Sequence, residues 1–522
     1  MKKFYVTTAI DYVNAAPHIG HAYEKIAADV MARFHRAAGN DVFFLTGVDE
    51  HGSKVEKSAE AAGKTPIQFC DEMAAKFEHS WKNLNLTYDH FIRTTEERHE
   101  KVVQHLFSKL KAQGDIYKST YIGLYCEGCE DFVREINLEN GNCATHKKPP
   151  RELAEENYFF KLTKYKPAIK KWLEENPTVV QPDGRRKEVL NQVADEELGD
   201  FSVSRSRKSL SWGIPIPDDD DQVIYVWMDA LTNYITGVGY LFDDEQFKRY
   251  WPADLHLIGK DITKFHSIYW IAFLMAAGIE LPKQIFAHGF ITVEGQKISK
   301  SLGNVIDPNS LVEMYGADAV RYYLMSGTTF EQDGDFSIND FRRKVNADLA
   351  NSLGNLLNRT LTLIDKNAGG TIPDAKPEHD LREKANTLQV VINNHMHKLE
   401  FAKAIDAIFA LVDQTNKYMN DEKPWALYKE GKDKEGHEVL YTSVEMLRRA
   451  AFHIYPFAPK LASDIWWQLG NDDEIGVPGD NDKHADGYFD MVPVGQKIRN
   501  SGPIFKRIED PDAEKKPEPK KK

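Results

Sequence analysis

Two short polar motifs hold the residues of this chain that are best suited to phosphate chemistry. His18-Ile19-Gly20-His21 follows an apolar run, Phe4 to Ile10, and a loop that ends at Pro17, and we expect it to open a helix. We expect the N–H groups at the amino terminus of this helix to be unpaired and so to attract phosphate. Imidazoles can donate hydrogen bonds there, and a glycine leaves room for a flat base. Lys297-Ile298-Ser299-Lys300-Ser301 adds two ammonium groups on a predicted loop. Together these groups suit the charge that develops when the α-phosphate of ATP is attacked and pyrophosphate leaves.

Each motif alone is also typical of a solvated surface turn. The order of the two motifs and the strand–loop–helix context of the first one favour the chemical interpretation. The elements around them alternate between apolar runs and amphipathic stretches, which predicts a parallel sheet with ligands at the carboxyl ends of its strands. The predicted strands are Phe4–Ile10, Val42–Val48, Val223–Met228, His256–Gly259 and Ile285–Val293, and the predicted helices are Gly20–Ala38, Glu96–Gln113 and Phe265–Ala277.

The second half of the chain is predicted to be helical. An apolar stripe at helical spacing runs through Val345, Leu349, Leu353, Leu356, Leu357 and Leu361, and a second one through Phe401, Ile405, Ile408 and Val412. A third helix over 443–469 should be split or kinked by Pro456 and Pro459. The charged Pro/Lys tail, 511–522, has the composition of a disordered segment.

Three of the 4 cysteines, Cys126, Cys129 and Cys143, lie close together in the sequence. With His146 they form two paired knuckles, C-x-x-C and C-x-x-H, whose three thiolates and one imidazole would fill the tetrahedral shell of a structural Zn²⁺. Iron–sulfur ligation and unrelated cysteines are the alternatives, and the histidine and the paired spacing favour zinc. Cys70 is expected in the core.

Composition limits the remaining possibilities. A chain of 522 residues with 42% hydrophobic and 28% charged residues fits a globular protein of several domains. No apolar run approaches a membrane span, and Asp11 interrupts the apolar stretch after the basic start, so we expect a cytoplasmic protein without a signal peptide. The net charge of −13 argues mildly against nucleic acid, although basic clusters occur at 185–187, 205–208 and 342–344.

The motif pair resembles the signature of the class I aminoacyl-tRNA synthetase family. The flanking residues, among them Asp49-Glu50-His51-Gly52, Tyr225 to Ala230 and Ile258 to Ile262, resemble its methionine-specific branch from Phe4 to about residue 465. The resemblance implies a ligase that activates L-methionine with ATP and Mg²⁺ and then charges tRNA(Met) for the initiation and elongation of translation. A synthetase for another amino acid, a silent RNA-binding paralogue and a small-molecule nucleotidyl transferase are the alternatives.

The resemblance also implies an architecture. We expect a Rossmann-like doubly wound parallel sheet (1–115 and 223–290), split by a connective insertion with the zinc knuckle (116–222). A stem-contact region with the K-I-S-K-S loop (291–340) and a helical anticodon-binding domain (341–510) should follow. The 116–222 insertion is too short for the large editing domain of the isoleucine, valine and leucine enzymes. Because the chain ends soon after the bundle, without an appended dimerisation domain, we expect a monomer.

Site residues follow from the positions that match the family's motifs. The matches place His18, His21, Lys297 and Lys300 in catalysis and ATP binding, Gly20 and Asp261 at the nucleotide, and Arg205 in support of activation. Asp49 should pair with the ammonium group of the substrate, and Trp227 and Tyr234 should form a wall against its thioether. The methionine site then comprises Ile10, Tyr12, Asp49, Trp227, Leu231, Tyr234, Ile262 and His266. Taken singly, Trp227 and His266 are equally typical of a protein core.

The predicted RNA contacts lie in the helical domain. Asn355 and Arg359 share one helix face and match an anticodon-reading pair, and Trp425 follows Lys423-Pro424 at a helix corner where a base can stack. A solvated polar face and a tryptophan packed on a helix end are the alternatives. Two positions depart from the commonest family pattern: Ile298 stands where methionine is usual, and Asp11 where an aromatic residue or proline is frequent.

Overall fold

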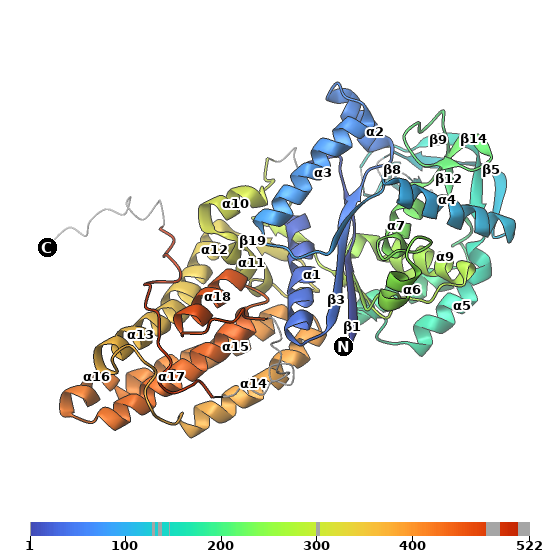
Figure 1. The fold of residues 1–522 in the computed structure, drawn as a ribbon. Helices are drawn as coiled ribbons and strands as arrows, with labels where there is room; N and C mark the ends of the chain where they lie inside the picture. The colour runs from blue at the N-terminus through green and yellow to red at the C-terminus, as the bar shows by residue number, and fades with distance from the viewer. Residues whose placement is uncertain are drawn as a thin grey trace.

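The computed structural model describes residues 2–127, 131–133, 138–145, 147–298, 303–476 and 491–509. Figure 1 shows an α/β body that contains the first strands of the chain, beside a body of helices from its second half. The first helix, α1 (Ile19–Ala37), lies between the strands and the helical body (Figure 1).

The central sheet has seven strands in the order β10-β16-β15-β1-β3-β2, and β4 also pairs with β3. All of these pairs are parallel. Strands from both sides of the predicted insertion therefore form one sheet, and the prediction of a doubly wound parallel sheet is confirmed. The strands are β1 (Lys3–Thr8), β2 (Asp11–Tyr12), β3 (Asp41–Asp49), β4 (His90–Arg93), β10 (Val180–Gln181), β15 (Leu255–Gly259) and β16 (Ile285–His288).

Helices cover both faces of the sheet because successive strand residues point to opposite sides. Val6 and Phe44 belong to one apolar cluster with α1 and α3, whereas Tyr5 and Leu45 belong to a second cluster with α4, α7 and α9. The first cluster continues into the helical body, so the two bodies share one core. The helices of the α/β body are α1, α2 (Ser53–Ala61), α3 (Pro66–Asn83), α4 (Glu97–Ala112), α5 (Leu162–Glu175), α6 (Asp183–Ala194), α7 (Val226–Thr236), α8 (Asp244–Tyr250), η2 (Lys260–Ile262), η3 (Phe265–Tyr269) and α9 (Trp270–Ala277).

Antiparallel strands dominate the stretch between α4 and α7. Two long strands, β5 (Ile116–Cys126) and β9 (Arg151–Phe160), form the centre of a 4-stranded sheet, and a 3-stranded sheet packs nearby. One strand of this stretch, β10, joins the edge of the central sheet instead. The remaining strands are β6 (Asp131–Val133), β7 (Leu138–Glu139), β8 (Asn142–Cys143), β11 (Phe201–Ser202), β12 (Ser204–Ser206), β13 (Pro215–Ile216) and β14 (Asp219–Ile224).

Two predicted strands differ from the structure. The strand predicted over Val223–Met228 ends at Ile224, and Tyr225 caps helix α7, so Trp227 lies in a first helical turn. A short apolar run is compatible with either element, and periodicity alone cannot separate them. The strand predicted over Ile285–Val293 breaks after His288 into β16 and β17 (Ile291–Val293), which pairs with β18 (Gln296–Lys297) and β19 (Gly334–Phe336).

A helical bundle follows α10 (Pro308–Tyr315) and α11 (Ala317–Ser326). The predicted stripe from Val345 to Leu361 is buried, and the predicted break at Pro456 and Pro459 separates α17 from α18. Among the described residues, no helix is both long and apolar enough to cross a bilayer. The helical elements are α12 (Ile338–Val345), η5 (Asn346–Gly354), α13 (Asn355–Asn367), α14 (His379–His397), α15 (Phe401–Glu422), α16 (Pro424–Leu427), η6 (Tyr428–Glu430), α17 (Asp433–Ile454) and α18 (Pro459–Gln468).

A buried charge cluster fastens α1 to α11 and to the corner between α17 and α18. Asp29 Oδ2 lies 2.8 Å from Arg33 Nε and 2.7 Å from an Arg321 nitrogen. Burial alone would raise the pKa of Asp29, but the two arginines lower it to about 2. Arg33 also donates to the Tyr455 hydroxyl, and Arg321 donates to the carbonyl oxygens of Leu84, Pro456 and Phe457.

Candidate active site

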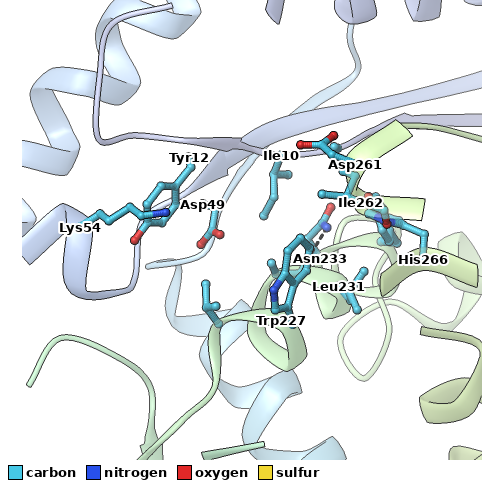
Figure 2. Close-up of a pocket in the computed structure, with 14 residues that line it drawn as sticks. Ile10, Tyr12, Asp49, Lys54, Trp227, Leu231, Asn233, Asp261, Ile262 and His266 are labelled. Carbon is cyan, nitrogen blue, oxygen red and sulfur yellow. Dashed lines mark hydrogen bonds between the residues drawn. The ribbon is translucent and has the colours of Figure 1, made fainter. Parts of the chain in front are cut away.

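A cavity of about 320 Å³ opens at the carboxyl edge of the central sheet. Ile10 follows β1, Asp49 ends β3 and Asp261 follows β15, so three neighbouring strands end at this cavity. This edge is where open α/β sheets bind their ligands. Figure 2 shows Tyr12 and Asp49 on one side of the cavity, Ile262 and His266 on the other, and Trp227 and Leu231 below.

Every side chain predicted for the amino-acid site lines this one cavity. The set contains Ile10, Tyr12, Asp49, Trp227, Leu231, Tyr234, Ile262 and His266, together with Asp261, which was predicted at the ribose. The structure adds lining residues that the sequence did not indicate: Ala9, Lys54, Val226, Ala230 and Asn233. Lys54 lies beside Tyr12, with its ammonium 5.7 Å from the ring centre (Figure 2).

The hydrogen bonds of His266 fix its tautomer. Its Nδ1 lies 3.0 Å from the Ile262 carbonyl, which can only accept, so Nδ1 carries the proton. Its Nε2 then accepts from the Tyr234 hydroxyl at 2.7 Å. Burial lowers the pKa of His266 to about 4, so the ring is neutral at physiological pH. This end of the cavity is therefore polar in composition but carries no charge on the imidazole.

Aromatic stacking sets the position of Trp227. Its ring lies 3.7 Å from that of Phe265 at an interplanar angle of 6°. Phe265 begins a π-helical turn, an irregularity that is frequent at functional sites. At the end of β15, Gly259 leaves room for the Asp261 carboxylate, since an added Cβ would lie 2.8 Å from Asp261 Oδ1. The indole thus presents a flat apolar surface to the cavity.

The two histidines of the first motif stack at the start of α1. Their ring centres are 3.8 Å apart, and each ring uses Nδ1 as an acceptor: His18 accepts from the Gly20 N–H, and His21 from the His18 N–H. Burial is the main reason that the pKa values of both fall to about 3. Both rings are therefore neutral and hold their proton on Nε2, which makes them hydrogen-bond donors rather than cations.

The first-turn amides of α1 differ from our expectation of a phosphate seat with unpaired N–H groups. Ile19 N–H donates to the Ile306 carbonyl at 3.0 Å, and Gly20 N–H donates to His18. His21 and Ala22 N–H groups both donate to the His18 carbonyl. His18 and His21 form a capping box, in which each imidazole accepts a hydrogen bond from a backbone N–H at the start of α1. Donation to an anion is thus left to the imidazole side chains.

The second motif lies against the first. A Cβ added at Gly20 would lie 3.7 Å from Ile298 Cδ1, and the bond between Ile19 and Ile306 closes the far side of the loop. Lys297 belongs to β18, which pairs with β17. The side chain of Lys297 and the whole of Lys300 lie outside the described residues. The two motifs are far apart in the sequence but adjacent in the fold.

Comparison with known proteins identifies this arrangement. A family model described as tRNA synthetases class I (M) matches residues 4–137 and 127–361, and a model of the anticodon binding domain of methionyl tRNA ligase matches residues 368–518. The chain belongs to the class I methionine–tRNA ligase family. The methionine–tRNA ligase of Thermotoga maritima is 44% identical over 98% of this chain and 81% of its own length. That of Nostoc sp. is 42% identical over 97% of this chain and 98% of its own length.

Solved structures agree with this membership. The Mycobacterium tuberculosis methionyl-tRNA synthetase in complex with methionyl-adenylate superposes with a TM-score of 0.92 at 40% identity. The match covers 97% of this chain and 100% of the mycobacterial one. The Rossmann-like sheet and the helical anticodon domain of the ligase family are thus both present in this chain.

Arg205 lies beside the cavity and not in it. The residue is 3% exposed on β12, and its guanidinium lies 4.2 Å from the centre of the Tyr225 ring. It donates to the Ser202 hydroxyl and to the Ser204 carbonyl, both at 2.8 Å. Tyr225 precedes Val226, which lines the cavity. Arg205 is therefore connected to the site through its contact with Tyr225.

The predicted anticodon residues gather near the tip of the helical bundle. Arg359 on α13 lies 5.4 Å from the centre of the Trp425 ring, and Trp425 is 38% exposed at the start of α16. Asn355 is exposed one turn before Arg359. Figure 1 shows α16 at the end of the bundle that points away from the central sheet. This is a surface cluster, which is compatible with the predicted RNA contacts and also with the alternative of a solvated polar face and a tryptophan packed on a helix end.

Two of the four predicted zinc ligands belong to the described chain. Cys126 ends β5 and Cys143 ends β8, and both are 3% exposed. Around Cys143 the backbone closes a tight turn, since Cys143 N–H donates to the Lys148 carbonyl and Lys147 N–H to the Cys143 carbonyl. Cys129 and His146 lie outside the described residues. Buried thiols beside a knuckle-like turn fit a structural metal shell.

Proposed function

We propose that this cavity activates L-methionine with ATP and that the protein then transfers the methionyl group to the 3′ end of tRNA(Met). The observation that supports this most directly is the cavity itself. It combines two carboxylates, Asp49 and Asp261, with an aromatic and aliphatic wall at the sheet edge where the two signature motifs meet. Membership of the methionine–tRNA ligase family supports the same reaction.

In this proposal Asp49 binds the ammonium group of methionine, and the thioether lies against Trp227 and Tyr234. Sulfur in contact with an aromatic ring is favourable, and a flexible thioether fits an irregular apolar wall better than a branched side chain does. His266 holds the Tyr234 hydroxyl and is itself neutral, so the end of the cavity does not attract a charged side chain. Ile10, Leu231 and Ile262 complete the apolar surface.

The first chemical step is an in-line displacement. A carboxylate oxygen of methionine attacks the α-phosphorus of ATP, the bond to the β-phosphate oxygen breaks, and pyrophosphate leaves methionyl-adenylate behind. His18 and His21 donate from Nε2 to phosphate oxygens and so stabilise the developing charge without a change in protonation. Lys297 and Lys300 contribute positive charge from the second motif, and Asp261 holds the ribose. Mg²⁺ that accompanies ATP neutralises phosphate charge and is held mainly by the phosphates.

The second step uses the tRNA. A ribose hydroxyl at its 3′ end attacks the carbonyl carbon of the adenylate, and AMP leaves. Asn355, Arg359 and Trp425 read the anticodon at the bundle tip, where the half-exposed indole offers a stacking surface for an unpaired base. Arg205 supports activation from beside the cavity. Because this reaction supplies charged tRNA to ribosomes, we propose that it takes place in the cytoplasm.

A structural Zn²⁺ bound by Cys126, Cys129, Cys143 and His146 completes the proposal. Such a closed shell of thiolates and one imidazole would stabilise the antiparallel insertion and would take no part in the chemistry. Metal analysis of the purified protein tests this directly, and a protein that folds and works without bound zinc would contradict it.

The deciding experiment is amino-acid-dependent exchange of labelled pyrophosphate into ATP. Methionine, isoleucine, leucine, valine and cysteine should be compared, and we expect exchange with methionine alone. Exchange with another amino acid would refute the assignment of the pocket but keep the reaction. No exchange from folded, zinc-loaded protein would favour a silent RNA-binding paralogue. Charging of tRNA(Met), but not of a tRNA with a changed anticodon, tests the second step.

A further inference from the structure

A second charged cluster lies buried next to Ala9, a residue that lines the amino-acid cavity. It consists of Asp11, Glu24, Lys25 and His288, each of which is at most 6% exposed. Lys25 and Glu24 follow the first motif on α1, Asp11 forms β2, and His288 ends β16. None of the four lines the cavity, and the reaction proposed above does not use them.

Lys25 is at the centre of this cluster. Its ammonium lies 2.6 Å from Asp11 Oδ1, 3.0 Å from Glu24 Oε1 and 2.9 Å from the Ala9 carbonyl oxygen. Burial would lower the pKa of Lys25, but the two carboxylates raise it above its ordinary value, so the group stays charged. All three ammonium protons thus have acceptors, and the side chain is held in one position.

The cluster also includes a residue of the central sheet, His288 at the end of β16. Glu24 Oε2 lies 2.9 Å from His288 Nε2, and His288 Nδ1 lies 2.8 Å from the Gly289 carbonyl. Gly289 N–H in turn bonds the Phe330 carbonyl, in the segment that leads to β19. The cluster therefore connects the β1–β2 segment with α1 and with the end of β16.

Two of the acceptors of Lys25 flank a residue of the cavity wall. Ala9 and Asp11 stand on either side of Ile10, and Tyr12 follows immediately. Ile10 and Tyr12 both line the cavity, and Figure 2 shows Tyr12 beside Asp49 and Ile10 between Asp49 and Asp261. In the described structure Tyr12 is also the register partner of Asp49 across β2 and β3. A shift of this segment would therefore move the apolar wall and the carboxylate relative to each other.

We propose that Lys25 is a positioning residue for the amino-acid pocket: through its ion pair with Asp11 and its hydrogen bond to Ala9 it holds Ile10 and Tyr12 in place. The inference rests on the proposed function, because it concerns the pocket for the activated amino acid. Lys25 does not line the cavity, and it acts on the pocket through the backbone of this segment. It should therefore govern the KM for methionine, whereas the KM for ATP and the kcat of the exchange reaction should change little.

The test compares Lys25→Met with a double variant, Lys25→Met with Asp11→Asn. The single variant leaves Asp11 without its cation and should lose thermal stability, since an uncompensated buried charge is costly. The double variant also removes the charge of Asp11 and should regain part of that stability, while Glu24 keeps its bond to His288. We expect both variants to raise the KM for methionine about tenfold, with less than a threefold change in kcat and in the KM for ATP.

The matched control is Lys3→Met at the opposite end of β1. Lys3 pairs with Asp254 at 3.0 Å and also donates to the Tyr250 carbonyl, but it lies away from the cavity. We expect this variant to keep the wild-type KM for methionine. If the double variant regains both stability and the wild-type KM, Lys25 is only a structural residue and the inference is refuted. A wild type without methionine-dependent exchange would instead refute the proposed function, and this inference with it.

Discussion

Removing one hydroxyl group at the end of the cavity gives the sharpest test of the pocket. Tyr234 is 1% exposed, and its hydroxyl donates to His266 Nε2 at 2.7 Å. The variant Tyr234→Phe leaves that nitrogen buried without a donor, while His266 Nδ1 stays bound to the Ile262 carbonyl. Since Tyr234 and His266 both line the cavity, the change acts directly on the wall that we assign to the thioether.

The magnitude follows from the burial of the orphaned nitrogen. An unsatisfied buried polar group costs about 1–3 kcal/mol, which corresponds to a roughly 5- to 150-fold fall in kcat/KM for methionine. Part of this loss appears in the KM for methionine, because the ring of His266 becomes free to rotate or to bind water in the cavity. The KM for ATP should change little, since Tyr234 lies on the amino-acid side of the site.

Pyrophosphate exchange at varied methionine concentration measures this effect, and Tyr5→Phe is its matched control. The Tyr5 hydroxyl is also buried and donates at 2.7 Å to the Tyr234 carbonyl, but Tyr5 does not line the cavity. Tyr5→Phe should therefore keep a kcat/KM within about threefold of the wild type while losing similar stability. Equal kcat/KM values for the two variants would refute the assignment of Tyr234 to the substrate wall.

Three further predictions concern other parts of the molecule. Since the folded-state pKa values of His18 and His21 are about 3, below the 6.5 of a free histidine, the unfolded chain binds more protons and these groups destabilise the fold as pH falls below 6.5. Between about pH 7.5 and 5.5, the unfolding free energy of H18N/H21N should therefore fall by about 3 kcal/mol less than that of the wild type. Urea titrations measure this difference, and equal losses would contradict the burial argument. Trp425→Ala should raise the KM for tRNA about tenfold or more in aminoacylation and leave pyrophosphate exchange unchanged, whereas a loss of exchange would mean a folding defect. Cys126→Ser should abolish zinc binding in metal analysis and lower the melting temperature, and retention of bound zinc would remove Cys126 from the ligand set.

The sequence predicts α1 almost to the residue because strong local signals mark its ends. His18 is the N-cap with a reciprocal capping box, and Gly39 follows the last turn with a φ of 75°. The pocket residues were predicted from the match to family motifs, and physical pattern alone would have left Trp227 in a core strand. Lys54 was not predicted as a lining residue, because the residues around it in the sequence do not show that α2 places its ammonium beside Tyr12.

Long-range packing explains the predictions that failed. The apolar run from Ile285 to Val293 is continuous in the sequence, but a Cβ at Gly289 would overlap the carbonyl of Gln332. The chain leaves the central sheet at that point because another segment crosses close to the glycine. The amides at the start of α1 were expected to be unpaired, but Ile306 supplies an acceptor from a segment that is remote in the sequence. Neither partner can be recognised from local residue patterns.

The buried charge cluster of Asp29, Arg33 and Arg321 joins α1 to the bundle and limits how far the two bodies can be treated as separable modules. Arg321 is fully buried, and two of its three carbonyl acceptors, Pro456 and Phe457, come from the corner between α17 and α18. A catalytic fragment that ends before the bundle would leave the Arg321 guanidinium without these two acceptors. The guanidinium would then face solvent or an apolar void beside α1, the helix that begins at His18 and His21. An exchange of anticodon domains between relatives would therefore have to transfer this corner together with its acceptors, or the activation site would lose part of its support.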